Sequence, residues 1–484
     1  MHTITVDTST AAAVVPLVVD LDGTLIGGDL LAETLVSHLA ARPFDFPVLF
    51  RVLQQGKAHL KHYLVDRHPL DPSCLPYQEP VMALIGSARA EGRPVFLATA
   101  SHEKYAAQIA EYLGLFDGVF ATNPSRNLAD RAKAELLKEE FGEGGFDYIG
   151  NSTADLAVWR YARRCYTIGI GRSVKRRLHT FGKEVQPLDA PRSRLREWAH
   201  ALRVHQYAKN LLIFVPVGVS QVFGLEVLLQ ALIAFISFSL AASAIYLVND
   251  MVDIADDRAH PRKRNRPLAS GAVSIHGAVA AVPVLLILSA LLALALPTYF
   301  LLVLAAYLAM TTAYSFSLKR KMLVDVIVLA LLYTVRVFAG SAATGITLSA
   351  WLLAFCLFAF SSLALIKRYT ELLVRLDSQL PDANNRNYQQ ADLPVIASLA
   401  AATGVNTVTV LALYIQSPEV VLQYQNPQIL LLLCPLILFL LSRALLMSHR
   451  RFMDDDPMVW ALKDSVSRFG VVFGGAILLS AALL

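Results

Sequence analysis

The sequence predicts two domains of different kinds: a soluble, Rossmann-like α/β domain over residues 1–190 and an all-α membrane bundle over residues 211–484. The composition changes sharply near residue 190, because long apolar runs separated by short breaks dominate after it. The whole chain is 55% hydrophobic and 17% charged, which is too apolar for an ordinary soluble enzyme. In the first domain, apolar strands end in acids, which is typical of the carboxyl edge of a parallel sheet.

The composition also limits the classes of function. A net charge of +5 is small for 484 residues, so we expect no nucleic-acid partner. The four cysteines are far apart and include no CxxC pair, so we expect neither a disulfide framework nor a zinc site. The first residues lack the basic region and cleavage pattern of a secretory signal peptide, and we do not expect one.

Three apolar segments of the first domain read as buried strands that end in polar residues. The segments are 16–19, 94–98 and 146–149. The first runs into Asp20 and Asp22, the second ends at Thr99, and the third is followed by Gly150, Asn151 and Asp155. Because parallel strands end at one edge of a sheet, these side chains are expected to meet there.

The order of these motifs resembles the haloacid dehalogenase-like (HAD) phosphohydrolases, over about residues 14–185. The resemblance implies that Asp20 attacks phosphorus and that Asp22 acts as general acid and base. It also implies a small helical cap within residues 25–94. The implied phosphate-binding residues are Thr24, Thr99 and Lys133, and the implied Mg²⁺ ligands are Asp20, Asp22 (through its carbonyl) and Asp155.

One departure from the HAD pattern leaves an alternative open. Many relatives carry an acid at the position of Asn151, so the domain could bind metal weakly and serve as a non-catalytic regulator.

The second domain contains nine candidate transmembrane spans, most of them near the ~20 residues needed to cross a bilayer. They are 210–223, 226–248, 274–295, 297–316, 323–343, 349–366, 393–415, 428–446 and 467–484. Alternate loops carry Lys and Arg, which predicts that these loops and the first domain lie on the cytoplasmic side of a bacterial inner membrane. Residues 191–210, basic and amphipathic, are expected to form a linker helix on the membrane surface or a plain basic linker.

An acidic motif opens at the end of the second span. Asn249, Asp253 and Asp257 lie four residues apart and Asp250 lies three before Asp253, a spacing that aligns their oxygens on one helix face. Closely grouped carboxylates suit Mg²⁺, which binds one or two carboxylates together with substrate phosphates. Basic residues follow, including Lys263 and Arg266, so the motif predicts a metal–diphosphate site.

This motif, followed by Arg-Pro-Leu-Ala-Ser-Gly at 266–271, resembles the UbiA superfamily of intramembrane prenyltransferases over about residues 195–484. Details including His260-Pro261, Tyr314 and Arg336 resemble one branch, the decaprenyl-phosphate phosphoribosyltransferases. The second cytoplasmic break, SLKRKMLVDV, offers only Asp325 and lacks the second acidic cluster typical of prenyl-diphosphate users.

The resemblance implies a Mg²⁺-dependent transfer of phosphoribose from phosphoribosyl diphosphate to a polyprenyl phosphate. The implied ligands of Mg²⁺ and the diphosphate are Asn249, Asp250, Asp253 and Asp257, with Lys263 and Arg266 on the phosphates. The implied lipid-phosphate residues are Lys209, Tyr314, Lys319 and Arg336. The HAD domain would then remove the 5-phosphate of the product. An aromatic prenyltransferase using a polyprenyl diphosphate, and a membrane scaffold with a sensing HAD domain, stay open as alternatives.

Overall fold

The computed structural model describes residues 15–123, 126–188, 193–377, 387–453 and 456–483. It divides into two compact units. The α/β unit combines the chain up to Leu202 with Tyr246–Ala281, and the helical unit combines Arg203–Ile245 with Val282–Leu484. The acidic motif after the second predicted span therefore belongs to the α/β unit, although helices of the membrane bundle lead into and out of it.

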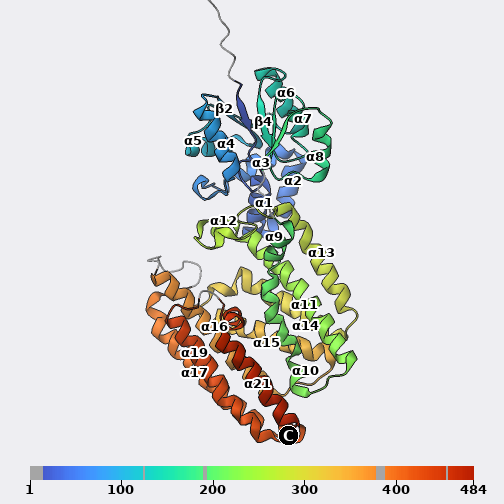
Figure 1. Ribbon diagram of the computed structural model, residues 1–484, viewed down its shortest axis with the longest axis vertical. Helices are drawn as coiled ribbons and strands as arrows, with labels where there is room; N and C mark the ends of the chain where they lie inside the picture. Colours follow the sequence, from blue (N-terminus) through green and yellow to red (C-terminus); the bar gives the residue numbers. More distant parts are fainter. Residues whose placement is uncertain (1–14, 124–125, 189–192, 378–386, 454–455, 484) are drawn as a thin grey trace, which may run out of the picture. The chain divides into compact units, whose positions relative to one another are not determined.

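The α/β unit is built on a six-stranded parallel sheet of order β3-β2-β1-β4-β5-β6 (Figure 1). The strands are β1 Leu17–Val19, β2 Val95–His102, β3 Gly118–Thr122, β4 Asp147–Gly150, β5 Cys165–Thr167 and β6 Val185–Pro187. The three predicted strands are confirmed as β1, β2 and β4, and they are neighbours in the sheet. Val19 lies opposite Leu97 on one side and Ile149 on the other, so the polar residues that follow all three strands share one edge.

Helices connect and cover these strands, as expected of a Rossmann-like fold. They are α4 Glu79–Ala90, α5 Glu103–Leu113, α6 Asp130–Phe141, α7 Leu156–Trp159 and α8 Arg172–His179. Between β1 and β2 the chain also forms α1 Leu30–Ala41, α2 Phe46–Gln54 and α3 Lys57–Val65, with the short 3₁₀ turns η1 Pro43–Asp45 and η2 Pro72–Cys74. Leu49, Leu60 and Leu64 form a separate apolar cluster there, which confirms the predicted small helical cap.

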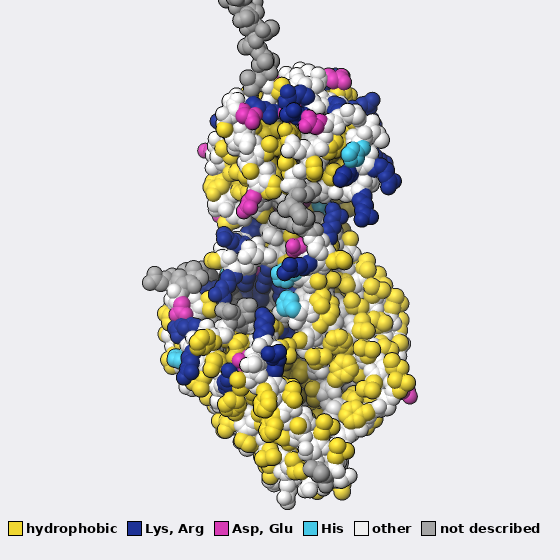
Figure 2. Space-filling model, viewed as in Figure 1, with side chains coloured by type: hydrophobic (Ala, Val, Ile, Leu, Met, Phe, Trp, Pro, Cys, Tyr) yellow, Lys and Arg dark blue, Asp and Glu magenta, His cyan; other side chains and the backbone are white. Residues whose placement is uncertain are grey.

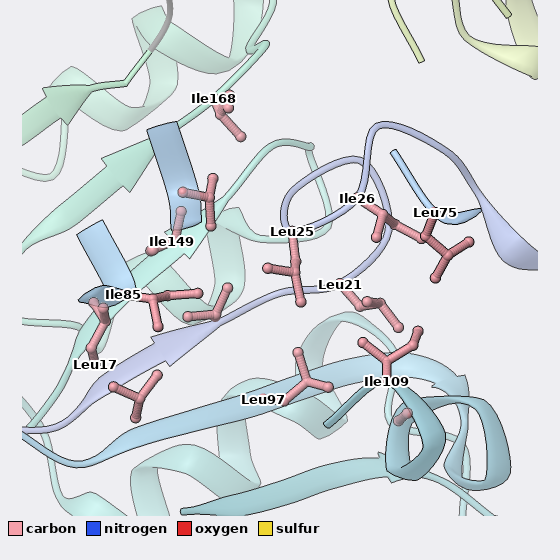
Figure 3. Close-up of a cluster of buried hydrophobic side chains, with 14 of the residues drawn as sticks. Leu17, Leu21, Leu25, Ile26, Leu75, Ile85, Leu97, Ile109, Ile149 and Ile168 are labelled. Carbon is pink, nitrogen blue, oxygen red and sulfur yellow. The ribbon is translucent and has the colours of Figure 1, made fainter. Parts of the chain in front are cut away.

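Apolar side chains alternate across the sheet, as the period of a strand requires. On one face Leu17, Leu97 and Ile149 pack with Ile85 of α4 and Ile109 of α5 (Figure 3). On the other face Val18, Tyr148 and Trp159 join a second buried cluster. The two clusters hold β1 between them, and β1 carries Asp20 at its end.

The helical unit and the segment that joins it contain eight described helices long and apolar enough to cross a membrane. They are α11 Leu225–Val252, α13 Ile275–Ala293, α14 Thr298–Phe316, α15 Val324–Thr344, α16 Ala350–Asp377, α17 Leu393–Ile415 (with its 3₁₀ start, Gln390–Ile415), α19 Leu433–His449 (with its 3₁₀ start, Pro427–His449) and α21 Ser465–Leu483. Short elements between them are α12 Ile254–Ala259, α18 Pro418–Gln423, α20 Pro457–Lys463 and the 3₁₀ turns η4 Lys263–Asn265, η5 Leu318–Arg320, η6 Gln390–Asp392 and η7 Pro427–Leu432.

The first predicted span, 210–223, is not a continuous helix of that length. The chain forms α9 Arg194–Ala201, then the 3₁₀ segment η3 Val204–Phe214 and the short helix α10 Val215–Ser220. Pro216 restarts the helix at its first turn, and the buried Lys209 and Asn210 side chains turn toward polar partners inside the bundle. Of the expected linker 191–210, residues 191–192 lie outside the described part of the chain.

Hydrophobic side chains cover the outer faces of the long helices (Figure 2). Phe469, Val471 and Val472 of α21 are each about 70% exposed, and Leu291 of α13 is 59% exposed. Such continuous apolar exposure is unfavourable in water and favourable against lipid tails.

We predict that Gly340→Ala destabilises the bundle, because a Cβ at this position of α15 would lie 2.0 Å from the carbonyl oxygen of Ile213. Overpacking of this kind costs about 1–3 kcal/mol. Gly475→Ala in α21 is the matched control, since no atom lies within 4 Å of its Cβ position. Thermal unfolding in detergent should show a lower midpoint for the first variant and an unchanged or higher one for the second; equal midpoints would contradict the close contact.

Candidate active sites

The loop after β1 places Asp20 and Asp22 at the carboxyl edge of the sheet. The amide of Asp20 donates to the Ile149 carbonyl at 3.1 Å, which anchors the end of β1 to β4. The Asp22 carboxylate accepts hydrogen bonds from the Ser101 hydroxyl at 2.5 Å and from the Leu30 amide at 2.9 Å. Asp22 is therefore fixed between the end of β2 and the first residue of α1.

Lys133 of α6 brings together the acids of two strands. Its Nζ lies 2.9 Å from Asp20 Oδ1 and 3.2 Å from Asp155 Oδ1, and all three side chains are buried. The Thr24 hydroxyl donates to Asp20 Oδ2 at 3.2 Å. Asp20, Thr24, Lys133 and Asp155, which span 136 positions of the sequence, thus form one cluster at the sheet edge.

The two oxygens of Asp155 accept five hydrogen bonds. Oδ2 receives the amides of Asn151 and Ser152 and the Ser152 hydroxyl, each at 3.0 Å, while Oδ1 receives Lys133 and the Tyr148 hydroxyl. A carboxylate has about four lone-pair positions, so these donors occupy it fully. Asp155 therefore shapes the loop after β4 and holds Lys133 in place.

The three acids Asp20, Asp22 and Asp155 differ in pKa because burial and neighbouring charges act on them to different extents. Burial raises the pKa of Asp20 to about 6, against the opposing effect of Lys133, and raises the pKa of Asp22 to about 7. Burial also opposes ionisation of Asp155, but Lys133 and the hydrogen bonds hold its pKa below the usual value. Near neutral pH the loop therefore holds a carboxyl group able to give a proton beside one able to act as a nucleophile.

Two residues near the end of β2 complete this site. The Thr99 hydroxyl accepts from the Ser101 amide at 2.9 Å and is fully buried. Lys61, on α3 of the cap, donates to the Ala100 carbonyl at 2.5 Å. Burial lowers the pKa of Lys61, and the nearby charge of Asp22 only partly opposes this shift. Sequence reasoning missed Lys61, because it lies in the helical interval and belongs to no motif.

The acidic motif of the membrane half occupies the end of α11 and the start of α12. The backbone bonds from Asp253 to Asn249 and from Asp257 to Asp253 preserve the four-residue helical spacing. Arg266 Nη1 lies 3.2 Å from Asp250 Oδ1 and 2.7 Å from Asp257 Oδ2, and both acids are buried. Two carboxylates thus converge on one cationic nitrogen.

The other members of this motif are more accessible. Asp253 is half-buried at the first position before α12, and Lys263 is exposed on η4. Burial raises the pKa of Asp257, and Arg266 counteracts that effect. The segment 249–266 therefore combines an accessible lysine, Lys263, with two buried acids, Asp250 and Asp257, that are paired with Arg266.

In the helical unit, Lys209 lies in a buried polar cluster that includes Asp456. Lys209 Nζ is 2.6 Å from Asp456 Oδ2, while Lys367 Nζ is 3.4 Å from the same oxygen. The Tyr333 hydroxyl also donates to this carboxylate, at 3.2 Å. Sequence reasoning missed Asp456 and Lys367 as members of a site, because 247 positions separate Lys209 from Asp456.

Arg336 lies inside the helical unit on a set of aromatic rings. Its Nε donates to Asn210 Oδ1 at 2.9 Å, and its guanidinium carbon lies 5.4–5.5 Å from the rings of Phe238, Tyr307 and Tyr333. Cation–π contact of this kind stabilises a desolvated guanidinium. Arg336 is therefore buried between the amide oxygen of Asn210 and three aromatic rings, and its role toward a lipid phosphate stays a prediction.

Asp325, the acid of the second cytoplasmic break, is fully buried and committed to two partners. Arg368 Nε donates to its Oδ2 at 2.5 Å and the Tyr388 hydroxyl to its Oδ1 at 2.6 Å. Arg368 also donates to the Tyr314 hydroxyl at 3.0 Å, while Lys319 is half-buried on η5. The acid therefore organises the basic and phenolic side chains around it.

We predict that Asp22→Asn stabilises the metal-free protein at pH 8. Because the folded-state pKa of Asp22 is about 7 and the usual value is 3.8, the folded protein holds a proton that the unfolded chain loses, and stability falls as pH rises through this window. Asparagine keeps the shape and cannot ionise, so the gain should approach about 4 kcal/mol at pH 8 and nearly vanish at pH 4.

Thermal unfolding in EDTA-containing buffer at both pH values measures this difference. Asp66→Asn is the control, because Asp66 is exposed and its hydrogen bond to Lys104 lowers its pKa. Equal pH dependence in the wild type and Asp22→Asn would contradict the prediction.

Comparison with known proteins adds to these contacts. The sequence pattern of the UbiA prenyltransferase family matches residues 212–463, just over half of the chain. An uncharacterized protein, y4nM, of Sinorhizobium fredii is 36% identical over 470 residues, which cover 96% of this chain and 91% of that protein.

A decaprenyl-phosphate phosphoribosyltransferase of Mycobacterium tuberculosis is 42% identical over 179 residues. That match covers 36% of this chain and 59% of the mycobacterial protein, less than two thirds of its length. A solved UbiA homologue from Archaeoglobus fulgidus bound to GPP and Mg²⁺ covers 58% of this chain and 99% of its own, with 17% identity and a TM-score of 0.45.

The parallel sheet, the cap and the clustered Asp20, Lys133 and Asp155 agree with a HAD-like N-terminal domain, and the apolar helices agree with an integral membrane protein. The chain belongs to the UbiA prenyltransferase family and joins its membrane bundle to an α/β domain built on a six-stranded parallel sheet.

Proposed function

We propose that the membrane half transfers 5-phosphoribose from phosphoribosyl diphosphate to a polyprenyl phosphate at the cytoplasmic face of a bacterial inner membrane. The observation that carries this choice is the commitment of Asp325 to Arg368 and Tyr388. Because the Asp325 carboxylate is bonded to these two side chains, the second cytoplasmic break offers a substrate basic groups and no free carboxylate for a metal. Basic groups suit an acceptor that carries a single phosphate. The likeness to decaprenyl-phosphate phosphoribosyltransferases supports the same choice.

The acidic motif would hold a magnesium ion together with the substrate diphosphate. Asp250 and Asp257 direct oxygens at one cationic nitrogen of Arg266, and Asn249 and Asp253 precede them with further oxygen donors. Hard oxygen ligands of this kind suit Mg²⁺. When bound, the ion would neutralise charge on the diphosphate leaving group.

The chain's own residues would position the two reactants. Lys263 and Arg266 would bind the diphosphate, because both follow the acids closely in the chain. The lipid phosphate would be held by basic and phenolic groups: Lys209, Tyr314, Lys319 and Arg336. An oxygen of the lipid phosphate attacks C1 of ribose, the C1–diphosphate bond breaks, and diphosphate leaves.

We further propose that the HAD-like domain removes the 5-phosphate from this product. Asp20 attacks phosphorus, the bond to the ribose 5-oxygen breaks, and Asp22 donates the proton to that oxygen. Asp22 then accepts a proton from the water that hydrolyses the aspartyl phosphate. Lys133, 2.9 Å from Asp20, is placed to hold the phosphoryl charge.

Magnesium also fits this second site through a small donor set. Asp20 and the carbonyl of Asp22 would supply oxygens, and the Asn151 amide lies against Gly23, where a Cβ would fall 1.9 Å from its nitrogen. One carboxylate plus the substrate phosphate is within the usual pattern for Mg²⁺, which would offset phosphoryl charge when bound. The hydrogen bonds that occupy Asp155 and the neutral side chain of Asn151 reduce the number of metal donors, so a non-catalytic regulatory domain is the alternative that the assay of Asp20→Asn has to exclude.

We predict that Asp257→Asn reduces phosphoribosyl transfer by at least about 100-fold, because it removes charge needed at the diphosphate. The assay supplies purified protein with labelled phosphoribosyl diphosphate, polyprenyl phosphate and Mg²⁺, and measures labelled lipid. The neighbouring Asp256→Asn is the matched control, since Asp256 is exposed. If the wild type makes no labelled lipid but prenylates an aromatic acceptor, the phosphoribosyl proposal is wrong.

We predict that Asp20→Asn leaves lipid synthesis intact but changes its product. The lipid should retain the 5-phosphate, because the nucleophile of the phosphatase is lost, whereas the wild type should release inorganic phosphate and yield phosphoribose without it. Mass spectrometry of the extracted lipid measures the difference. The same dephosphorylated product from both proteins would sink the phosphatase assignment and favour a regulatory domain.

A further inference from the structure

A buried ion pair joins the HAD-like domain to the acidic segment of the transferase, within the α/β unit. Glu33 lies on α1 of the cap, and Arg258 lies on α12, one residue after Asp257. Arg258 Nη1 donates to Glu33 Oε2 at 2.7 Å and Nη2 donates to Oε1 at 2.8 Å. Planar, two-point contacts of this kind fix orientation as well as distance.

Arg258 also holds the loop that follows the acids. Its Nε donates to the Ala269 carbonyl at 2.9 Å, within the Arg-Pro-Leu-Ala-Ser-Gly motif. The guanidinium of Arg258, a residue of α12, therefore contacts α1 through Glu33. It also holds the segment after Arg266 through a hydrogen bond to Ala269. Arg266 in turn contacts Asp250 and Asp257.

Three glycines allow the two segments to approach this closely. A Cβ on Gly271 would lie 2.1 Å from the carbonyl oxygen of Gly27. A Cβ on Gly28 would lie 2.1 Å from Glu33 Oε1 and 2.8 Å from Arg258 Nη2. The junction between residues 27–33 and 258–271 thus needs glycine for two reasons. The backbones of Gly27 and Gly271 touch, and the absence of a side chain at Gly28 leaves room for the Glu33–Arg258 pair.

The same cap segment begins at the phosphatase acid. The Leu30 amide, at the start of α1, donates to Asp22 Oδ1, and the Gly23 amide donates to the Gly28 carbonyl at 2.8 Å. Residues 22–33 therefore run as one hydrogen-bonded segment from Asp22 to Glu33. Asp22 and Glu33 are therefore separated by one short hydrogen-bonded turn and the first turn of α1.

We propose that Glu33 is a positioning residue of the transferase: through Arg258 it fixes the segment that carries Asp257 and Arg266, and it couples that segment to the occupancy of the phosphatase site. The proposal rests on the proposed function for its kinetic readout. It predicts that a phosphoryl group bound at Asp20 changes the affinity for phosphoribosyl diphosphate, because both sites bias one junction.

Glu33→Gln in the full-length protein tests the positioning role, with Glu139→Gln, an exposed glutamate of α6, as the matched control. The variant should raise the KM for phosphoribosyl diphosphate by about tenfold and leave the KM for polyprenyl phosphate unchanged. Hydrogen exchange should increase at the amides of residues 254–271. The double variant Glu33→Gln with Arg258→Gln should show a smaller loss than the two single variants combined, since neither charge is left unpaired.

Coupling is tested with beryllium fluoride, which mimics a phosphoryl group on Asp20. In the wild type it should shift the KM for phosphoribosyl diphosphate, and the shift should vanish in Glu33→Gln and in Asp20→Asn. If Glu33→Gln and Glu139→Gln agree in KM, in exchange and in the beryllium fluoride shift, the inference is overturned. A lower melting temperature with equal loss of every activity would also overturn it, since that is a purely structural effect.

The exchange measurement separates this inference from the proposed function. If the wild type has no phosphoribosyl transfer, the proposed function fails, yet increased exchange at 254–271 in Glu33→Gln alone still supports the junction. Normal transfer with unchanged exchange fails the inference and leaves the proposed function intact.

Discussion

A buried carboxylate is stable only when a positive charge or several hydrogen bonds compensate for the water it has lost, and this requirement organises the functional segments of the chain. Lys133 lies between Asp20 and Asp155, and Arg266 lies between Asp250 and Asp257. In each case one cation holds two acids that come from different elements. Removing such a cation would weaken the compensation of two carboxylates at once, so each cation fixes the positions of both acids as well as their protonation states.

The same requirement explains which parts of the sites the sequence could predict. Asp20 with Asp22, and Asn249 with Asp257, are close in sequence, and strand and helix geometry alone brings their oxygens to a shared edge or face. Partners of long sequence separation carry no such local signal. Asp456 reaches Lys209, and Lys61 reaches the end of β2, only through tertiary packing.

The fold shows a similar division. Of the nine spans that the apolar runs predict, eight correspond to long apolar helices in the described part of the chain, because length and hydrophobicity are local properties. The segment 210–223 differs, since a hydropathy pattern does not register that Lys209 and Asn210 are buried in a 3₁₀ segment, or that Pro216 lies in the first turn of a new short helix. Composition places the start of the membrane domain at residue 211, where the apolar runs begin. The compact α/β unit nevertheless includes Tyr246–Ala281, which comes later in the chain. The domain boundaries given by composition therefore stay a prediction.

The Glu33–Arg258 pair also has a consequence for biosynthesis. The two residues are 225 positions apart, and a ribosome adds about 5–20 residues per second. Glu33 is therefore synthesised roughly 10–45 s before its partner. The HAD-like domain can complete its sheet in that interval, while its α1 surface still holds a hydrated carboxylate. Arg258 is synthesised only after the apolar segment of α11, so the junction cannot close until that segment has been made, and the α/β unit is completed by a part of the chain that follows a membrane helix.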